Sequence, residues 1–140
     1  MLTKSADLGH LFCMEFIYKI EPVSKLRPVL SARNGFARAI TKPKTRNFEA
    51  AIAQESRLMY KGDPLDVPLA VSVKFFITRP PSAKRKLPNV RPDLENFIKS
   101  VFDGCNGIIW KDDSLICRIE ASKEYSTSSG FIVLNVVPIE

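Results

Sequence analysis

An apolar stripe along one predicted helix constrains the fold of this chain more than any other feature of its sequence. Six residues at helical spacing form the stripe: Leu94, Phe97, Ile98, Val101, Phe102 and Cys105. Pro92 precedes them, Asp93 is a residue type that often caps a helix N-terminus, and Gly104 and Gly107 mark the end. Because a helix with one apolar side must bury it against another element, the stripe predicts a layered globular fold.

The other patterns supply the layer against which this helix packs. Alternating apolar residues predict strands at residues 12–20, 69–77, 115–121 and 131–138. Helical spacing predicts an earlier helix with Thr45 as its N-cap, ended by Lys61-Gly62-Asp63-Pro64. The expected fold class is α+β: a single domain with a mixed β-sheet of about four to five strands, two main helices packed on it, and the order β-α-β-α-β-β.

Length and composition exclude several classes of protein. The 140 residues suffice for one domain, which we expect over residues 12–140, with residues 1–11, including His10, as a flexible N-terminal tail. No apolar run reaches the ~18 residues that span a bilayer, and no secretory signal is apparent. Three cysteines without CxxC spacing disfavour disulfides and a zinc site and fit a reducing cytoplasm; Cys105 and Cys117 are predicted to be core residues.

Positive charge is concentrated in two proline-containing segments that hold no acidic residue. The chain has 21 Lys and Arg against 15 Asp and Glu, a net charge of +6, which suits a polyanion such as nucleic acid. Both segments, residues 25–46 and 79–91, are predicted to be loops or extended arms. Candidate phosphate-binding residues are Lys25, Arg27, Arg33, Lys42, Lys44, Lys84, Arg85, Lys86 and Arg91. A solvated, flexible surface is the alternative reading of each segment.

Acidic residues form two clusters close in sequence. Asp93 and Glu95 lie in the first turn of the apolar-striped helix, where the helix dipole alone favours acids, and Asn96, Lys99 and Asp103 continue along its polar side. Asp112 and Asp113 follow in a turn before the next strand. If the fold joins the clusters, carboxylates would need a cation, and Mg²⁺ prefers such oxygen ligands. A carboxylate-bound Mg²⁺ beside basic loops is the composition of a metal-dependent nuclease.

These residues carry a resemblance to a known family. The run RPDLENFIKSVFDGCNGIIWKDDSLI, residues 91–116, resembles the signature of the RusA family of crossover-junction endodeoxyribonucleases: P-D-x-D-N-x-x-K, then D-x-x-x-G, then a D-D pair and a strand. The resemblance extends over about residues 12–140. It implies a homodimer that cuts Holliday junctions (four-way DNA) in recombination and repair with Mg²⁺, for which Mn²⁺ can substitute, in a bacterial or phage setting.

The resemblance also implies roles for individual residues. Asp93, Glu95 and Asp113 match the essential acids, with Asp112 as a further metal ligand, and Lys99 matches the essential lysine. Asn96 and Asp103 match other motif positions and are assigned supporting roles. Glu95 departs from the pattern, because the best-known members have Asp there. Its extra methylene keeps the charge and shifts the carboxylate oxygens by about one bond length.

Three alternatives remain open at this point. The Glu95 departure raises the possibility of a catalytically impaired module that only binds branched DNA. A metal-dependent phosphohydrolase acting on nucleotides is another, and it would have little use for the basic segments. Finally, Phe102 and Trp110 could stack on DNA bases, although the apolar stripe predicts a core position for Phe102.

Overall fold

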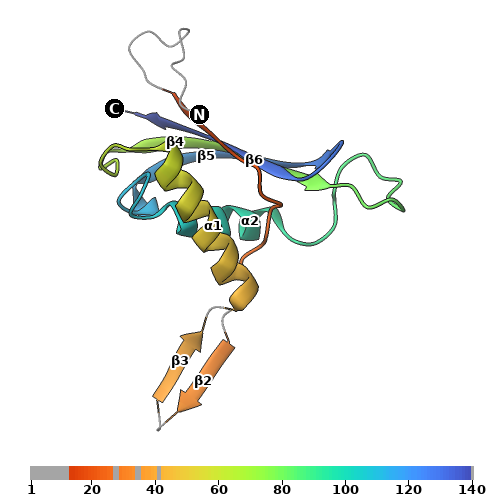
Figure 1. Ribbon diagram of the computed structural model, residues 1–140, viewed down its shortest axis with the longest axis horizontal. Coiled ribbons are helices and arrows are strands. Elements are labelled where there is room, and N and C mark those ends of the chain that lie inside the picture. The colour runs from red at the N-terminus through yellow and green to blue at the C-terminus, as the bar shows by residue number, and fades with distance from the viewer. Residues whose placement is uncertain (1–12, 27–28, 34–35, 41, 140) are drawn as a thin grey trace.

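A four-stranded mixed sheet and two helices form the two layers of the computed structural model, which describes residues 13–26, 29–33, 36–40 and 42–139 (Figure 1). The predicted tail over residues 1–11 and His10 lie outside the described residues. The sheet order is β1-β6-β4-β5. The strands are β1 (Met14–Tyr18), β4 (Leu69–Thr78), β5 (Ile116–Ser126) and β6 (Phe131–Pro138). The sequence prediction of a single α+β domain, with these strands and two helices in the order β-α-β-α-β-β along the chain, is confirmed.

Strand β4 lies in the middle of the sheet and explains its clear sequence pattern. It pairs antiparallel with β6 and parallel with β5, while β1 pairs antiparallel with the other side of β6. The alternating residues Leu69, Val71, Val73 and Phe75 are all buried on the face that the helices cover. A parallel pair needs a crossover connection, and the chain segment between β4 and β5, which contains the second helix, provides it.

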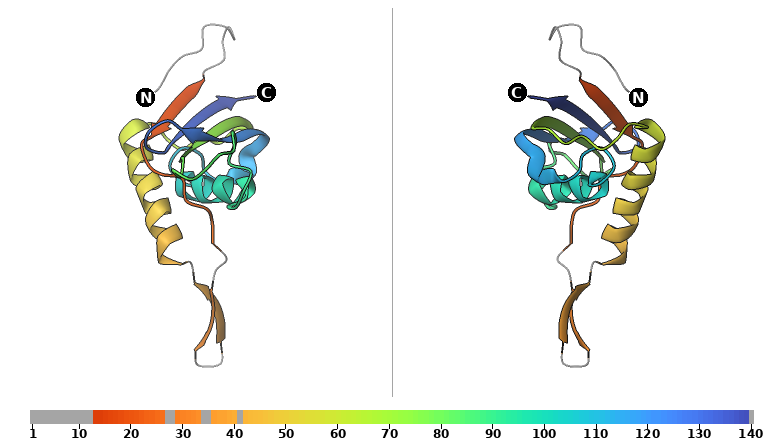
Figure 2. Two further views of the ribbon diagram at one scale, coloured as in Figure 1. Left: turned by 90° about the vertical axis from the view of Figure 1, so that its right-hand side faces the viewer. Right: turned by 90° about the vertical axis from the view of Figure 1, so that its left-hand side faces the viewer.

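Both helices pack on the same face of the sheet, and none of the residues that the structure describes forms a helix on the opposite face (Figure 2). Helix α1 is Pro43–Met59 and helix α2 is Leu94–Cys105. The predicted apolar stripe is confirmed, because Phe97, Val101, Phe102 and Cys105 are buried and Leu94 and Ile98 pack against the core. Among the described residues, neither helix combines the length and the apolar character needed to cross a membrane.

Of the two predicted helix caps, Thr45 is wrong and Asp93 is confirmed in position. Lys42 occupies the N-cap position of α1, and Thr45 lies inside the first turn, where it is buried and its Oγ1 accepts a hydrogen bond from the Leu26 N–H at 3.2 Å. Pro43 explains the earlier start, since proline suits the first position of a helix. Asp93 does occupy the N-cap position of α2, but its side chain makes no capping hydrogen bond.

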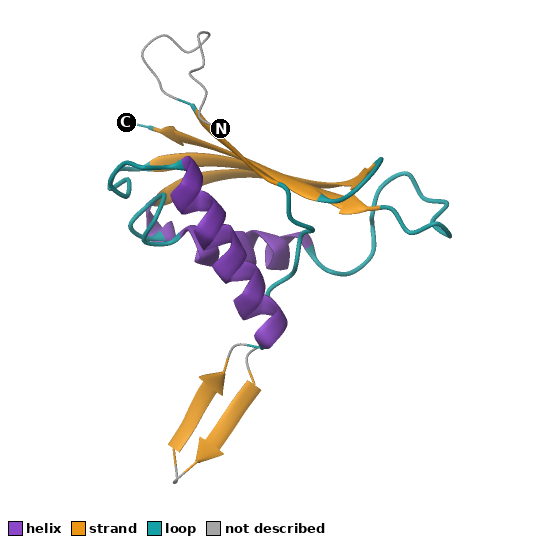
Figure 3. Cartoon of the chain, in the orientation of Figure 1, coloured by secondary structure: helices purple, strands orange, loops and turns teal. Residues whose placement is uncertain are grey.

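The first basic segment is not simply a loop. Strands β2 (Val29–Arg33) and β3 (Phe36–Ile40) pair antiparallel as a separate two-stranded sheet. This hairpin extends away from the two layers, next to the start of α1 (Figure 1). The second basic segment is a loop with turns between β4 and α2, as predicted (Figure 3). Each basic segment therefore projects from the packed core.

The side chains of Trp110, Phe102 and Cys117 settle three other predictions. Trp110 is fully buried, packs edge-on against Phe102 with ring centroids 5.3 Å apart, and donates its Nε1–H to Asn106 Oδ1 at 2.7 Å. Neither ring is open to a DNA base, so the stacking alternative is wrong. Cys105 is buried as predicted, whereas Cys117 is exposed at the start of β5, where the register with β4 shifts between its neighbours Ile116 and Arg118.

Candidate active site

The start of helix α2 presents two uncommitted carboxylates to solvent. Asp93 at the N-cap and Glu95 in the first turn are both exposed. Within the described part of the chain, neither side chain makes a hydrogen bond or an ion pair. The helix dipole favours negative charge at this end. These two carboxylates are therefore free to engage a ligand from outside the chain.

Lys99 connects this helix to the second acidic cluster. Its Nζ lies 3.4 Å from Asp103 Oδ1, one turn further along α2, and 3.9 Å from Asp113 Oδ2. Asp113 begins a short 3₁₀ helix, η2 (Asp113–Leu115), which leads directly into β5. The fold thus brings Asp113 against the polar side of α2. The lysine, rather than a direct contact between carboxylates, makes the connection.

Asp112 is engaged in its own turn. Its Oδ2 accepts a hydrogen bond from the Ser114 N–H at 3.1 Å, so it caps η2. The hydrogen bonds from the Ser114 side chain and backbone lower the pKa of Asp112, and the backbone of Asp113 and the charge of Lys99 act in the same direction. Asp112 is fully exposed and ionised at neutral pH, with one oxygen committed to the turn.

The side chains of this site have the oxygen donors that the implied Mg²⁺ would need. Exposed carboxylate oxygens without partners at Asp93 and Glu95, and a half-buried carboxylate at Asp113, are the hard ligands that Mg²⁺ prefers. However, no three acidic, histidine or cysteine side chains of the described residues converge on one point. The donors are therefore distributed over the start of α2 and η2, and binding a cation would require side-chain movement.

Lys123 is a functional candidate that the sequence reasoning missed. It lies on β5 opposite Phe75, on the face toward the helices, and its Nζ donates to the backbone carbonyls of Val90 at 2.8 Å and Pro92 at 2.9 Å. These contacts hold the end of the second basic loop directly before Asp93, where the Arg91–Pro92 peptide bond is cis. The alternation of β5 gives its face, but its backbone partners are visible only in the fold.

The predicted phosphate-binding residues differ in their surroundings. Lys42, Lys44, Lys84, Lys86 and Arg91 are exposed and make no ion pair within the described part of the chain. Arg85 donates to the Tyr125 hydroxyl at 3.3 Å, and Arg79 lies over the same ring, 5.1 Å from its centroid. Lys25 alone is half-buried between two carboxylates. Arg33 ends β2 at the outer end of the hairpin, and Arg27 lies outside the described residues.

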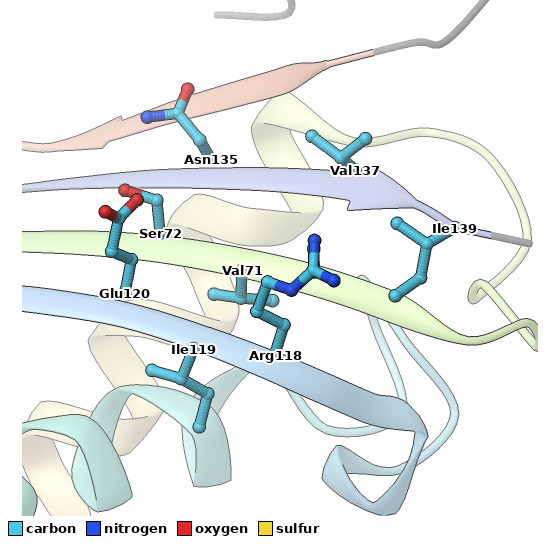
Figure 4. A pocket seen from close by; sticks show the side chains of 9 residues that line it. Val71, Ser72, Arg118, Ile119, Glu120, Asn135, Val137 and Ile139 are labelled. Carbon is cyan, nitrogen blue, oxygen red and sulfur yellow. The ribbon is translucent and has the colours of Figure 1, made fainter.

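A separate hollow lies on the outward face of the sheet, about 510 Å³ in volume (Figure 4). Ser72, Arg118, Glu120 and Asn135 contribute its polar groups. None of the predicted site residues lines it. The acids of the candidate site lie with the helices on the other side, so the hollow and the candidate site are distinct surfaces.

Fold and site together define a class: a small α+β protein whose acidic surface, centred on α2 and η2, is bordered by projecting basic segments. Comparison with known proteins identifies it further. This chain belongs to the RusA endodeoxyribonuclease family, whose sequence pattern matches residues 19–135. It is also 30% identical over 126 residues to the uncharacterized protein YqaN of Bacillus subtilis (strain 168), covering 81% of this chain and 89% of that protein. The family consists of endonucleases that hydrolyse DNA and implies Holliday junction resolvase activity.

Proposed function

We propose that this chain is a Mg²⁺-dependent, structure-specific endonuclease that acts as a homodimer on four-way DNA junctions in recombination and repair. One observation carries the proposal: in a chain of this family, Lys99 Nζ on the polar side of α2 lies 3.9 Å from Asp113 Oδ2, so one side chain joins the helix that begins after Asp93 to the second acidic cluster. We assign the activity to residues 12–140 and a cytoplasmic setting in a bacterium or phage.

Each residue has a distinct role in this proposal. Asp93, Glu95 and Asp113 would hold the metal ion, with Asp112 beside them. When bound, Mg²⁺ or Mn²⁺ activates water and offsets charge on the phosphate. Lys99 would supply a positive charge next to the scissile phosphate. Asn96 and Asp103 support the helix from which these side chains extend.

The basic segments would hold the DNA backbone. Lys42 and Lys44 at the start of α1, and Lys84 and Lys86 in the second loop, are exposed cations. Arg27, Arg33, Arg85 and Arg91 complete the proposed contacts, whereas Lys25 is already paired with two carboxylates. Since a junction has approximate twofold symmetry and needs two cuts, a C2 dimer matches the substrate.

Cleavage of a synthetic four-way junction tests the function. The purified protein should cut the junction with Mg²⁺ or Mn²⁺, leave linear duplex of the same sequences intact, and show no cleavage in EDTA. Asp93→Asn and Asp113→Asn should abolish cleavage and retain junction binding, because removing negative charge does not weaken phosphate contacts. Glu15→Gln, on the outward side of the sheet, is the matched control and should cut normally.

The same assay distinguishes the alternatives. Tight junction binding without cleavage under any metal would identify a module that only binds branched DNA. Cleavage at an equal rate in EDTA would exclude the metal mechanism. Cleavage of the Glu95→Asp variant at a much higher rate than the wild type would show that the longer side chain limits catalysis.

A further inference from the structure

Five charged side chains of alternating sign form a continuous series of ion pairs from α1 to η2, here called the charge chain. Lys25 Nζ lies 2.5 Å from Glu49 Oε1 and 3.2 Å from Asp103 Oδ2. The other oxygen of Asp103 lies 3.4 Å from Lys99 Nζ, which in turn lies 3.9 Å from Asp113 Oδ2. Asp103 is therefore the centre of the charge chain, because one of its carboxylate oxygens contacts Lys25 and the other contacts Lys99.

The inner half of the charge chain is shielded from solvent. The side chains of Lys25, Glu49 and Asp103 are 20%, 22% and 19% exposed, whereas Lys99 is 57% exposed. Burial alone would lower the pKa of Lys25, but the hydrogen bonds and charges of Glu49 and Asp103 outweigh it and raise that pKa. Lys25 thus remains a cation with two partners, and removing it would leave the shielded Glu49 carboxylate without the cation that it pairs with among the described residues.

The backbone around Lys25 is fixed as firmly as its side chain. The Lys25 N–H donates to the Asn96 carbonyl at 2.8 Å, and the Ser100 hydroxyl donates to the Val23 carbonyl at 2.5 Å. These bonds attach the segment before the hairpin to α2. Both the backbone position of Lys25 and the partners of its ammonium group are therefore fixed, unlike those of the exposed lysines in the two basic segments.

We propose that Lys25 and Asp103 are positioning residues for Lys99, an inference that rests on the proposed function. Lys25 fixes Asp103 by one oxygen, and the second oxygen of Asp103 holds the flexible Lys99 side chain beside Asp113. Lys99 would otherwise sample many rotamers, because more than half of it is exposed. Lys25 then acts within the protein and not as a phosphate contact.

A double-mutant cycle on the full-length protein tests the proposal. Asp103→Asn and Lys25→Met should each lower kcat on a four-way junction roughly 10- to 100-fold, because misplacing a catalytic group is costly, with little change in KM or junction affinity. The double variant should be no slower than Asp103→Asn alone, since both changes interrupt one connection. Lys25→Arg should recover most of the rate. Lys111→Met, which breaks the exposed pair between Lys111 and Asp66, is the matched control and should leave kcat unchanged.

A second readout does not depend on cleavage. NMR relaxation of the Lys99 side chain should show increased mobility in both variants and not in Lys111→Met. Independent effects of the two substitutions on kcat, unchanged Lys99 mobility, or a Lys25→Met variant that only weakens junction binding would each overturn the proposal. A wild-type protein that fails to cleave would refute the proposed function instead, and the mobility measurement would still decide the role of the charge chain.

Discussion

The three cysteines occupy environments that differ enough to rank their reactivity. Cys105 is fully buried at the helix–sheet interface. This burial raises the pKa of its thiol to about 12, although the hydrogen bonds with Tyr18 and Ser56 act to lower that pKa. Partial burial, and then the charge of Glu15, raise the pKa of Cys13. Cys117 is exposed on β5. Since the thiolate is the nucleophile, reactivity should follow exposure and low pKa.

Thiol labelling at pH 8 should therefore proceed in the order Cys117, Cys13, Cys105. We expect Cys105 to react only as fast as the protein unfolds, which peptide mass spectrometry in the presence and absence of denaturant would measure. Cys117→Ser should remove the fastest phase alone. Rapid labelling of Cys105 in the native protein would contradict the burial of the α2 apolar stripe.

At the scale of residues, the sequence indicates which side chains have the chemistry of the site, but it does not indicate which side chains contact one another. The resemblance assigned Asp93, Lys99 and Asp113 to one site, and the fold brings Lys99 and Asp113 within 3.9 Å. The partners of Lys25 could not be predicted, because Glu49 and Asp103 lie 24 and 78 residues away and reach it only through the packing of α1 on α2. A basic residue in a basic segment resembles a phosphate contact until its neighbours are known.

At the scale of elements, the close approach of α1 and α2 depends on Gly104. A Cβ at this position would lie 2.8 Å from Ile52 Cβ and 3.1 Å from the Glu49 carbonyl oxygen, and the latter is backbone that cannot rotate away. The Glu49 side chain belongs to the charge chain, so the spacing of these helices also sets the distance that Lys25 spans. Glycine here serves helix packing, while Gly107 is the residue with positive φ after the helix.

Gly104→Ala should destabilise the protein. Alanine in a helix would alone stabilise it by about 1 kcal/mol, but overpacking typically costs about 1–3 kcal/mol, so we expect a net loss in the free energy of unfolding measured by urea denaturation. Gln54→Ala, on the exposed side of α1, is the control and should change stability by less than about 0.5 kcal/mol. A more stable Gly104→Ala variant would mean that the helices can separate at low cost.

Elements with strong periodicity were predictable, and the hairpin was not. The alternation in β4 and the stripe in α2 are dictated by burial, so their residues report the fold directly. Within the described part of the chain, strands β2 and β3 form a two-stranded sheet separate from the four-stranded sheet whose burial dictates that alternation. The Asn34-Gly35 dipeptide is a typical two-residue hairpin signal, but the prolines and basic residues around it favoured a loop.

At the scale of the whole molecule, the net charge of +6 is a difference between two surfaces. The basic residues project on the hairpin, the start of α1 and the loop after β4, outside the packed layers. Five acids, Asp93, Glu95, Asp103, Asp112 and Asp113, lie on α2 and η2 or directly before them, and the other acids are spread over the rest of the chain. In the proposed function, such a separation would place a polyanion's backbone on the projecting segments and its reactive phosphate near the carboxylates, a division that total charge cannot reveal.

This separation predicts how junction binding depends on salt. Each lysine that neutralises a phosphate contributes about 0.9 to the slope of log K against log salt, so Lys84→Ala and Lys86→Ala should each weaken binding and reduce that slope by about this amount. Lys74→Ala is the control, because Lys74 is an exposed lysine on the outward face of β4. Fluorescence anisotropy with a labelled junction at several salt concentrations measures all three slopes.

Which of the three salt slopes decreases shows where the DNA lies on the protein. Reduced slopes for both loop variants with an unchanged slope for Lys74→Ala would place the junction along the second basic loop, adjacent to Asp93. The reverse result would place DNA on the outward face of the sheet, where Arg118 and Lys74 lie, and would separate binding from the proposed acids by the thickness of the sheet. Unchanged affinity and full activity in both loop variants would favour a nucleotide-sized substrate, because only an extended polyanion needs contacts so far from the carboxylates.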